Sequence, residues 1–224
     1  MTKILEILSF FGGGLCHQKA DRTFSVDTFN MPVCSRCTGI YLGIILSLLT
    51  IILLERKIKG ELPSLKIVLS AVGVFLFMGA EVVLSMLGLI ESGNIIRLVT
   101  GLLTGWFMAL ILFPIANNVM FGKFIKKNYL GSRKKFLIWG LSGIAVIIIF
   151  IFTYKYALFF WSFISILGLV IFAALILLIL IFSLNKRLLG SIDSMRKYII
   201  AIIIGFILAS ILLSLFSYLK RFLV

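Results

Sequence analysis

The chain has 224 residues, of which 62% are hydrophobic and 13% are charged, and it contains 3 Pro. A soluble domain is typically about 45–50% apolar and about 25% charged, so this composition excludes an ordinary soluble protein, a disordered chain and a disulfide-rich module. It predicts an all-α polytopic membrane protein. The formal charge of +14 does not indicate a nucleic-acid partner, because cations that lie in short runs between apolar stretches are typical of loops that meet membrane lipids.

The first predicted element is a short helix from Ile4 to Phe11 that lies in the membrane interface or re-enters the membrane. The segment is too short to span and carries Glu6, and it makes a poor signal peptide. Three glycines, Gly12 to Gly14, follow at once. We expect the helix to end there, because glycines free the backbone to turn.

Six later stretches are apolar over about 20 residues, the length needed to cross the hydrocarbon. Each is expected to be a helix, because a backbone in lipid must satisfy its own hydrogen bonds and no β-barrel pattern is present. The expected spans are Thr38 to Leu54, Ile67 to Ile90, Leu98 to Ile115, Phe136 to Tyr154, Ala157 to Leu184 and Tyr198 to Leu219. The chain then divides into an outer-face segment (1–37), a polar helix core formed by the first three spans (38–120) and an apolar helix scaffold (121–224).

Loop charge predicts the orientation of these spans. Fourteen Lys and Arg residues follow the first, third and fifth spans, and eight lie on the opposite side. Loops rich in these residues stay in the cytoplasm, so both termini are predicted to be extracytoplasmic, at the cell membrane. The fourteen are Arg56, Lys57, Lys59, Lys66, Lys123, Lys126, Lys127, Arg133, Lys134, Lys135, Lys186, Arg187, Arg196 and Lys197.

All three Cys and the single His of the chain fall in one polar segment before the first span. Cys34 and Cys37 are spaced C-x-x-C, which lets two sulfurs converge on one ion or on each other, and Cys16 and His17 precede them. Three thiolates and one imidazole form the ligand set of a closed tetrahedral zinc site. The sequence therefore predicts that these four residues bind zinc or another soft transition metal.

Other interpretations of the cysteines stay open. Cys37 lies at the mouth of the first span, where cysteine packs like a small apolar residue. A disulfide between Cys34 and Cys37, or from Cys16 to either, is chemically reasonable on an oxidising face, and a C-x-x-C pair also serves thiol redox chemistry. Neighbouring side chains usually diverge, so Cys16 and His17 need not reach one ion together.

The residues around these cysteines resemble a known family. The pattern reads Cys16-His17-Gln18, Arg22-Thr23-Phe24, then Pro32-x-Cys34-x-Arg36-Cys37-Thr38-Gly39-x-Tyr41-x-Gly43. It resembles the signature of the domain of unknown function 2085 family of predicted bacterial and archaeal membrane proteins. The likeness extends to Glu81, where the family more often has Asp, and to Asn94-x-x-Arg97-x-x-Thr100-Gly101-x-x-x-Gly105. The resemblance implies a membrane protein, and it implies no substrate or chemistry.

An ionisable residue within the second predicted span is a further candidate. Glu81 would lie roughly 14 Å below the outer end of that span at about 1.5 Å per residue, where an acidic residue costs about 2.5–3.5 kcal/mol. We expect its side chain to face the bundle interior, to be protonated, or to meet a cation or metal. Arg97 begins the next span on the same side and would have to reach inward to pair with it. A structural hydrogen bond is the alternative.

The Arg-Cys-Thr-Gly segment at the first span and the Arg97-to-Gly105 segment at the third share one pattern. Each has an Arg at the outer mouth and two glycines four residues apart, Gly39 and Gly43 in one and Gly101 and Gly105 in the other. Such glycines form a flat strip on which helix backbones approach closely. The first and third spans are therefore predicted to pack there.

These features predict a site at the outer face of the membrane. The leading hypothesis is a metal-binding membrane protein whose cationic and polar residues bind an anionic lipid head group or lipid-linked substrate. The binding residues would be Arg22, Arg36, Asn94 and Arg97.

The chemistry of this site stays open. A catalytic metal site would use Glu81 as proton acceptor and leave His17 or water at an exchangeable position. One alternative is a membrane thiol-disulfide oxidoreductase that uses Cys34 and Cys37. Another is a small proton- or ion-coupled transporter that uses Glu81. Membrane lipids are the expected partners, and the sequence does not indicate an oligomeric state.

Overall fold

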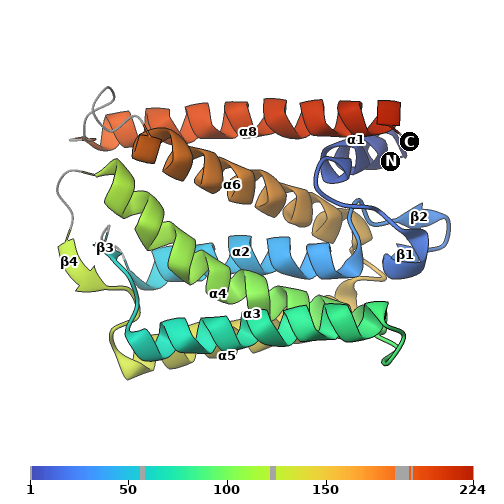
Figure 1. Cartoon of the computed structure of the whole chain (residues 1–224), viewed down its shortest axis with the longest axis horizontal. Helices are drawn as coiled ribbons and strands as arrows, with labels where there is room; N and C mark the ends of the chain where they lie inside the picture. The colour runs from blue at the N-terminus through green and yellow to red at the C-terminus, as the bar shows by residue number, and fades with distance from the viewer. Residues whose placement is uncertain (1, 56–58, 122–124, 185–191, 193, 224) are drawn as a thin grey trace.

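The computed structural model describes residues 2–55, 59–121, 125–184, 192 and 194–223 (Figure 1). Within these residues the fold is all-α apart from four short strands and one 3-10 turn. The helices are α1 (Thr2–Gly13), α2 (Ser35–Leu54), α3 (Leu65–Met86), α4 (Asn94–Met120), α5 (Arg133–Thr153), α6 (Leu158–Leu184) and α8 (Met195–Leu223). The other elements are η1 (Ala20–Arg22), β1 (Ser25–Val26), β2 (Phe29–Asn30), β3 (Lys59–Glu61) and β4 (Ile125–Asn128).

Six of the described helices are long and apolar enough to cross a membrane. This confirms the predicted all-α bundle of six spans with a short N-terminal helix. Most spans begin two to four residues earlier than expected, at Ser35, Leu65, Asn94, Arg133 and Met195. The reason is that hydropathy detects only the part of a helix that suits lipid, whereas these helices begin with a polar or charged turn.

The end of α3 is earlier than predicted, whereas α4 continues beyond the predicted Ile115 to Met120. Gly88 has φ +71°, and the N–H of Leu89 donates to the carbonyl of Leu84 at 3.0 Å. This is the Schellman arrangement, in which a left-handed glycine ends a helix, so α3 ends at Met86 instead of running on to Ile90. Glu81 consequently lies only about one and a half turns from the end of its helix, shallower than predicted.

The core is built around α2, which packs against α4, α5 and α6. Its glycines meet those of α4, as predicted. A β-carbon on Gly43 would lie 2.5 Å from the carbonyl oxygen of Leu102, and one on Gly105 would collide with the carbonyl of Ile40. The two helices therefore run in parallel with their backbones in contact, and this holds their first turns side by side.

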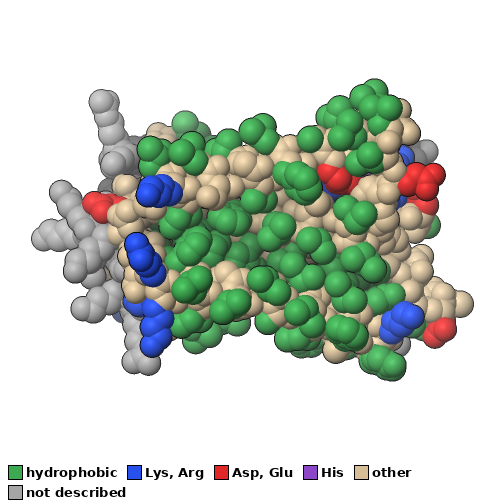
Figure 2. All heavy atoms as spheres, turned by 90° about the horizontal axis from the view of Figure 1, so that it is seen from below, with side chains coloured by type: hydrophobic (Ala, Val, Ile, Leu, Met, Phe, Trp, Pro, Cys, Tyr) green, Lys and Arg blue, Asp and Glu red, His purple; other side chains and the backbone are tan. Residues whose placement is uncertain are grey.

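Both termini lie at the same end of the bundle as α1, β1 and β2, whereas β3 and β4 lie at the opposite end (Figure 1). The face seen in Figure 2 is largely hydrophobic between these ends, with Lys and Arg side chains near one end and mostly Asp and Glu at the other. The orientation of the spans in the membrane stays a prediction. Five of the cations on which it depends lie outside the described residues, namely Arg56, Lys57, Lys123, Lys186 and Arg187.

The N-terminal segment forms the cap over the start of α2. Its helix, α1, covers the predicted Ile4 to Phe11 and continues into the glycines. A β-carbon on Gly12 would collide with the carbonyl of Pro32, and one on Gly14 would lie 2.7 Å from the carbonyl of Leu213 in α8. These glycines therefore do more than end the helix, because they let it pack directly on the loop before α2 and on α8.

Candidate metal centre

The three cysteine sulfurs meet at the N-terminus of α2. Cys16 follows α1, Cys34 is the residue before α2 begins, and Cys37 lies in its first turn. Their Sγ atoms all lie within 4.8 Å of one another, and none of the three forms a disulfide. Three sulfurs on one tetrahedral zinc ion lie about 3.8 Å apart, because each Zn–S bond is about 2.3 Å long. The cluster thus fits a metal ion after a small contraction.

Backbone N–H groups already point at one of these sulfurs. Cys16 Sγ accepts hydrogen bonds from the N–H of Cys34 at 3.2 Å and of Gln18 at 3.4 Å. Gln18 has φ 53°, a left-handed conformation that turns its N–H back toward Cys16. Hydrogen bonds of this kind favour the thiolate, the form of cysteine that binds metals.

The cysteines also change one another's pKa. Hydrogen bonds from Cys16, and then from Cys37, lower the pKa of the Cys34 thiol, although its burial opposes this. The pKa of Cys16 is raised, first by its hydrogen bond to Cys34. A cation that binds here would displace protons from these thiols, because the thiolate is the form that binds metals.

His17 is not brought into this cluster. Its side chain is exposed, and it is absent from the group of ligand atoms that lie within 4.8 Å of one another in the described residues. It does line the cavity beside the sulfurs. The side chains of Cys16 and His17 diverge, as neighbouring side chains usually do.

A cavity of about 300 Å³ opens next to the three cysteines. Its walls come from the N-terminal segment and from the first turns of α2 and α4. It is lined by Leu15, Cys16, His17, Lys19, Arg22, Cys34, Arg36, Cys37 and Arg97. The structure therefore brings the three predicted arginines to the predicted cysteines. Asn94 lies elsewhere, in a neighbouring cavity with Thr23 and Tyr154, and its amide nitrogen donates to the Thr23 carbonyl at 3.4 Å.

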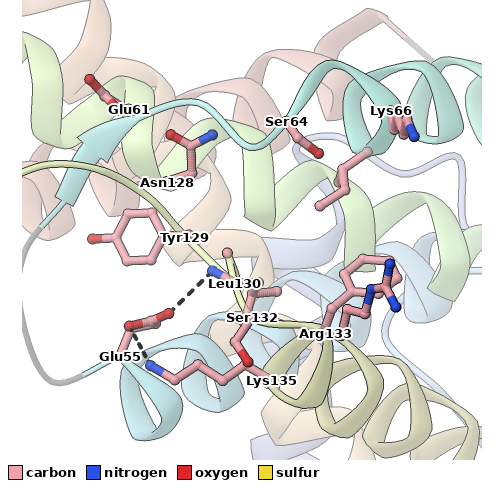
Figure 3. A pocket seen from close by; sticks show the side chains of 13 residues that line it. Glu55, Glu61, Ser64, Lys66, Asn128, Tyr129, Leu130, Ser132, Arg133 and Lys135 are labelled. Atoms are coloured by element: carbon pink, nitrogen blue, oxygen red, sulfur yellow. Dashed lines mark hydrogen bonds and ion pairs between the residues drawn. The ribbon is translucent and has the colours of Figure 1, made fainter.

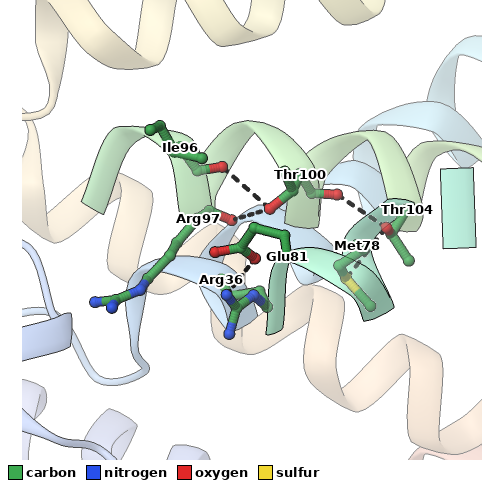
Figure 4. Close-up of polar contacts among 7 residues, drawn as sticks. All are labelled: Arg36, Met78, Glu81, Ile96, Arg97, Thr100 and Thr104. Atoms are coloured by element: carbon green, nitrogen blue, oxygen red, sulfur yellow. Dashed lines mark hydrogen bonds and ion pairs between the residues drawn. The ribbon is translucent and has the colours of Figure 1, made fainter. Parts of the chain in front are cut away.

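Glu81 pairs with Arg36 and not with Arg97 (Figure 4). Its side chain is 5% exposed, and Arg36 Nη2 donates to its Oε2. Figure 4 shows the guanidinium of Arg97 pointing away from this carboxylate. Glu81 is not among the residues that line the cavity, so it contacts the site through Arg36.

Several residues that hold the site together were not identified from the sequence. The side-chain amide of Gln18 donates to the carbonyls of Ser9 at 2.6 Å and Pro32 at 2.7 Å, which ties α1 to the loop that carries Cys34. Ser35 Oγ donates to the Arg22 carbonyl at 2.9 Å. Gln18 belongs to the Cys-His-Gln motif, and this was the only signal of its role in the sequence.

The C-terminal turn of α8 also contacts this site. Lys220, in the last turn of α8, donates to the carbonyl of Cys16 at 2.7 Å and approaches that of Gly13 at 3.4 Å. More than 200 residues separate Lys220 from Cys16. A pattern in the local sequence cannot reveal such a contact.

Comparison with known proteins places the site in a family. Residues 16–111 match the predicted membrane proteins of domain of unknown function 2085. An uncharacterised protein of Methanocaldococcus jannaschii is 27% identical over 110 residues, which are 49% of this chain and 69% of that protein. One of Methanothermobacter thermautotrophicus is 36% identical over 97 residues, 43% of this chain and 83% of its own length. No solved structure matches significantly.

The matched region begins at Cys16 and ends within α4. It contains the three cysteines, the three arginines of the cavity and Glu81. Since a relative is matched over most of its length, this multi-pass membrane protein belongs to the domain of unknown function 2085 family.

Proposed function

We propose that Cys16, Cys34 and Cys37 bind a zinc ion at the extracytoplasmic face of the membrane, beside a cavity that takes the anionic part of a lipid or lipid-linked substrate. The observation that carries this proposal is the approach of all three sulfurs to within 4.8 Å of one another. A soft transition metal is the natural partner of three thiolates.

The proposed site has three protein ligands, the number typical of catalytic zinc sites, whose fourth position is open to water or substrate. A bound zinc ion would supply a Lewis acid for an oxygen ligand in the cavity. His17 lies at the cavity wall, where it is a candidate to exchange with that ligand. Cys16, Cys34 and Cys37 hold the ion, and the arginines orient the anion.

Glu81 is assigned a positioning role in this proposal. Its carboxylate pairs with the guanidinium of Arg36 and does not itself line the cavity. The same ion pair removes support from Glu81 as the ion site of a transporter, because Arg36 already compensates its charge.

Metal analysis of the protein purified without chelators tests the proposal. We expect one equivalent of zinc, lost in Cys34→Ser and Cys37→Ser but retained in His17→Ala. Arg133→Gln, an exposed change at the opposite end of the bundle, is the control and keeps the metal. Helical content measured by circular dichroism shows that each variant has folded.

Thiol labelling distinguishes the proposed metal site from thiol-disulfide chemistry at the same cysteines. If the proposal is right, the three thiols are protected as purified and react with an alkylating reagent after the metal is removed. Metal-free protein with a disulfide that includes Cys34 or Cys37 would contradict the metal site and favour thiol-disulfide chemistry.

A further inference from the structure

The Lys, Arg, Asp and Glu residues that line the cavity beside the cysteines are all basic. Lys19, Arg22, Arg36 and Arg97 are four of its nine lining residues, and none of the nine, all of them described, is Asp or Glu. Asp21 lies 3.4 Å from Arg22 Nε, but its side chain is 71% exposed and water screens its charge. The cavity therefore has a positive potential that attracts anions.

The Nε atoms of Arg22, Arg36 and Arg97 are buried and make no hydrogen bond among the described residues, although that of Arg22 is ion-paired with Asp21. A buried donor without an acceptor is unfavourable, and most such groups in folded proteins are satisfied. Because all three arginines line one cavity, an anion bound there would supply acceptors to their guanidinium groups.

The arrangement of the arginines indicates the shape of that acceptor. Arg22 comes from η1, Arg36 from the first turn of α2 and Arg97 from the first turn of α4, so the guanidinium groups approach from separate elements. A carboxylate presents two oxygens in one plane and suits a single guanidinium, whereas a phosphate presents oxygens in several directions. The N-termini of α2 and α4 add positive partial charge at this end.

Charge balance points to the same ligand. Three thiolates and a divalent ion carry one negative charge together, and Glu81 supplies another next to Arg36. Against four basic side chains this leaves an excess of about one to two positive charges, the lower figure counting Asp21 next to Arg22, and a phosphate monoester carries about −1.5 to −2 at pH 7.

We infer that the cavity binds a phosphate group, held by Arg22, Arg36 and Arg97 next to the cysteine cluster. This inference rests on the proposed function and names the ligand class of the same site. The phosphate belongs either to a lipid head group or to a soluble molecule, because both present the same oxygens to the arginines.

Calorimetric titration of the zinc-loaded protein in detergent tests the inference. The probes are inorganic phosphate and short-chain phosphatidic acid, with acetate and short-chain diacylglycerol, which has no phosphate, as controls. We expect saturable binding of a phosphate probe, at least about tenfold tighter than binding of its control, because acetate can engage fewer guanidinium groups and diacylglycerol has no anionic group to accept their charge-assisted hydrogen bonds. Binding of phosphatidic acid alone identifies a lipid source, and binding of inorganic phosphate identifies a soluble one.

Variants connect the binding to the named residues. Arg22→Gln and Arg97→Gln should weaken the binding of phosphate by at least about tenfold at unchanged zinc content, and Arg133→Gln should leave it unchanged. Equal binding of acetate, absence of binding to both phosphate probes, or wild-type affinity in both arginine variants would overturn the inference. Protein that holds no metal yet binds phosphate through these arginines would contradict only the proposed metal site.

Discussion

A buried carboxylate meets a cation near each end of the bundle, and the two pairs differ in how completely they are satisfied. At the end away from the termini, Glu55 accepts hydrogen bonds from Lys135 Nζ at 2.9 Å and from the N–H of Leu130 at 3.2 Å (Figure 3). At the cysteine end, Glu81 Oε2 pairs with Arg36, but its Oε1 is buried without a hydrogen-bond partner among the described residues.

The cavities next to these pairs differ in the same way. The cavity at the Glu55 end is larger, about 850 Å³, and it is lined by acids as well as bases, including Glu55, Glu61, Lys66 and Lys135. The cavity at the cysteine end is smaller and its charged lining is wholly basic. Size is therefore a poor guide to function here. Incomplete hydrogen bonding and unbalanced charge at the cysteine end support the binding site proposed there.

The largest effect is expected where α2 and α4 touch near the cysteine end. In Gly101→Ala the new β-carbon would collide with the carbonyl of Arg36, so the helices must separate. We expect a loss of about 3 kcal/mol in the free energy of unfolding and weaker zinc binding, measured by chemical unfolding in detergent and by metal analysis.

Gly79→Ala is the matched control for this change. Nothing lies within 4 Å of a β-carbon at Gly79 in α3, so alanine should stabilise the helix by about 0.5–1 kcal/mol. Equal behaviour of the two variants would show that close approach of α2 and α4 does not organise the cysteine end.

An effect of intermediate size is expected when either buried carboxylate, Glu55 or Glu81, is replaced by an amide. Glu55→Gln removes the charge that faces Lys135, and we expect a loss of about 1.5 kcal/mol in the free energy of unfolding with unchanged phosphate binding. Glu81→Gln should cost less stability, because one oxygen of Glu81 already lacks a partner. It should also tighten phosphate binding a few-fold, since it removes a negative charge next to Arg36 while a side-chain oxygen remains to orient the guanidinium.

Glu81→Ala tests whether Glu81 affects phosphate binding by positioning Arg36 or only through its negative charge. It removes the same charge but leaves Arg36 without its partner, so phosphate binding should weaken instead. Calorimetric titration of the three variants measures these effects. Tighter phosphate binding in Glu81→Ala would contradict the positioning role of Glu81. A change of phosphate affinity in Glu55→Gln would contradict the assignment of phosphate binding to the cysteine end alone.

Much of this fold follows from local sequence. A run of about 20 apolar residues must form a helix in lipid, so the six spans are predictable. The glycines of α2 and α4 are also predictable as a contact, because they leave a flat strip on each helix. The C-x-x-C spacing places Cys34 and Cys37 together within one helical turn, and the composition of the segment suggested Cys16 as their partner.

The partner of Glu81 was not predictable. Arg36 and Arg97 occupy equivalent places in the two repeated segments, and the choice between them depends on how α3 is rotated against α4. Consecutive apolar residues such as Leu76, Phe77 and Met78 point to different sides of α3, so its sequence does not define a buried face. The early end of α3 was missed for a related reason, because hydropathy does not register the left-handed turn at Gly88.

The smallest effect is expected from the contact between the two ends of the chain. Lys220 donates to the carbonyls of Cys16 and Gly13, so Lys220→Met should loosen the Cys16 loop without removing a metal ligand. A single partly exposed interaction of this kind contributes less than about 1 kcal/mol, and zinc affinity should therefore fall by no more than about fivefold at unchanged stoichiometry. A competition titration with a chelator measures this. Arg221→Met is the control, because Arg221 lies over the ring of Phe10 at 5.1 Å and not against the cysteine loop. The same loss of affinity in both variants would mean that α8 supports α1 in general and that Lys220 has no specific part in holding Cys16.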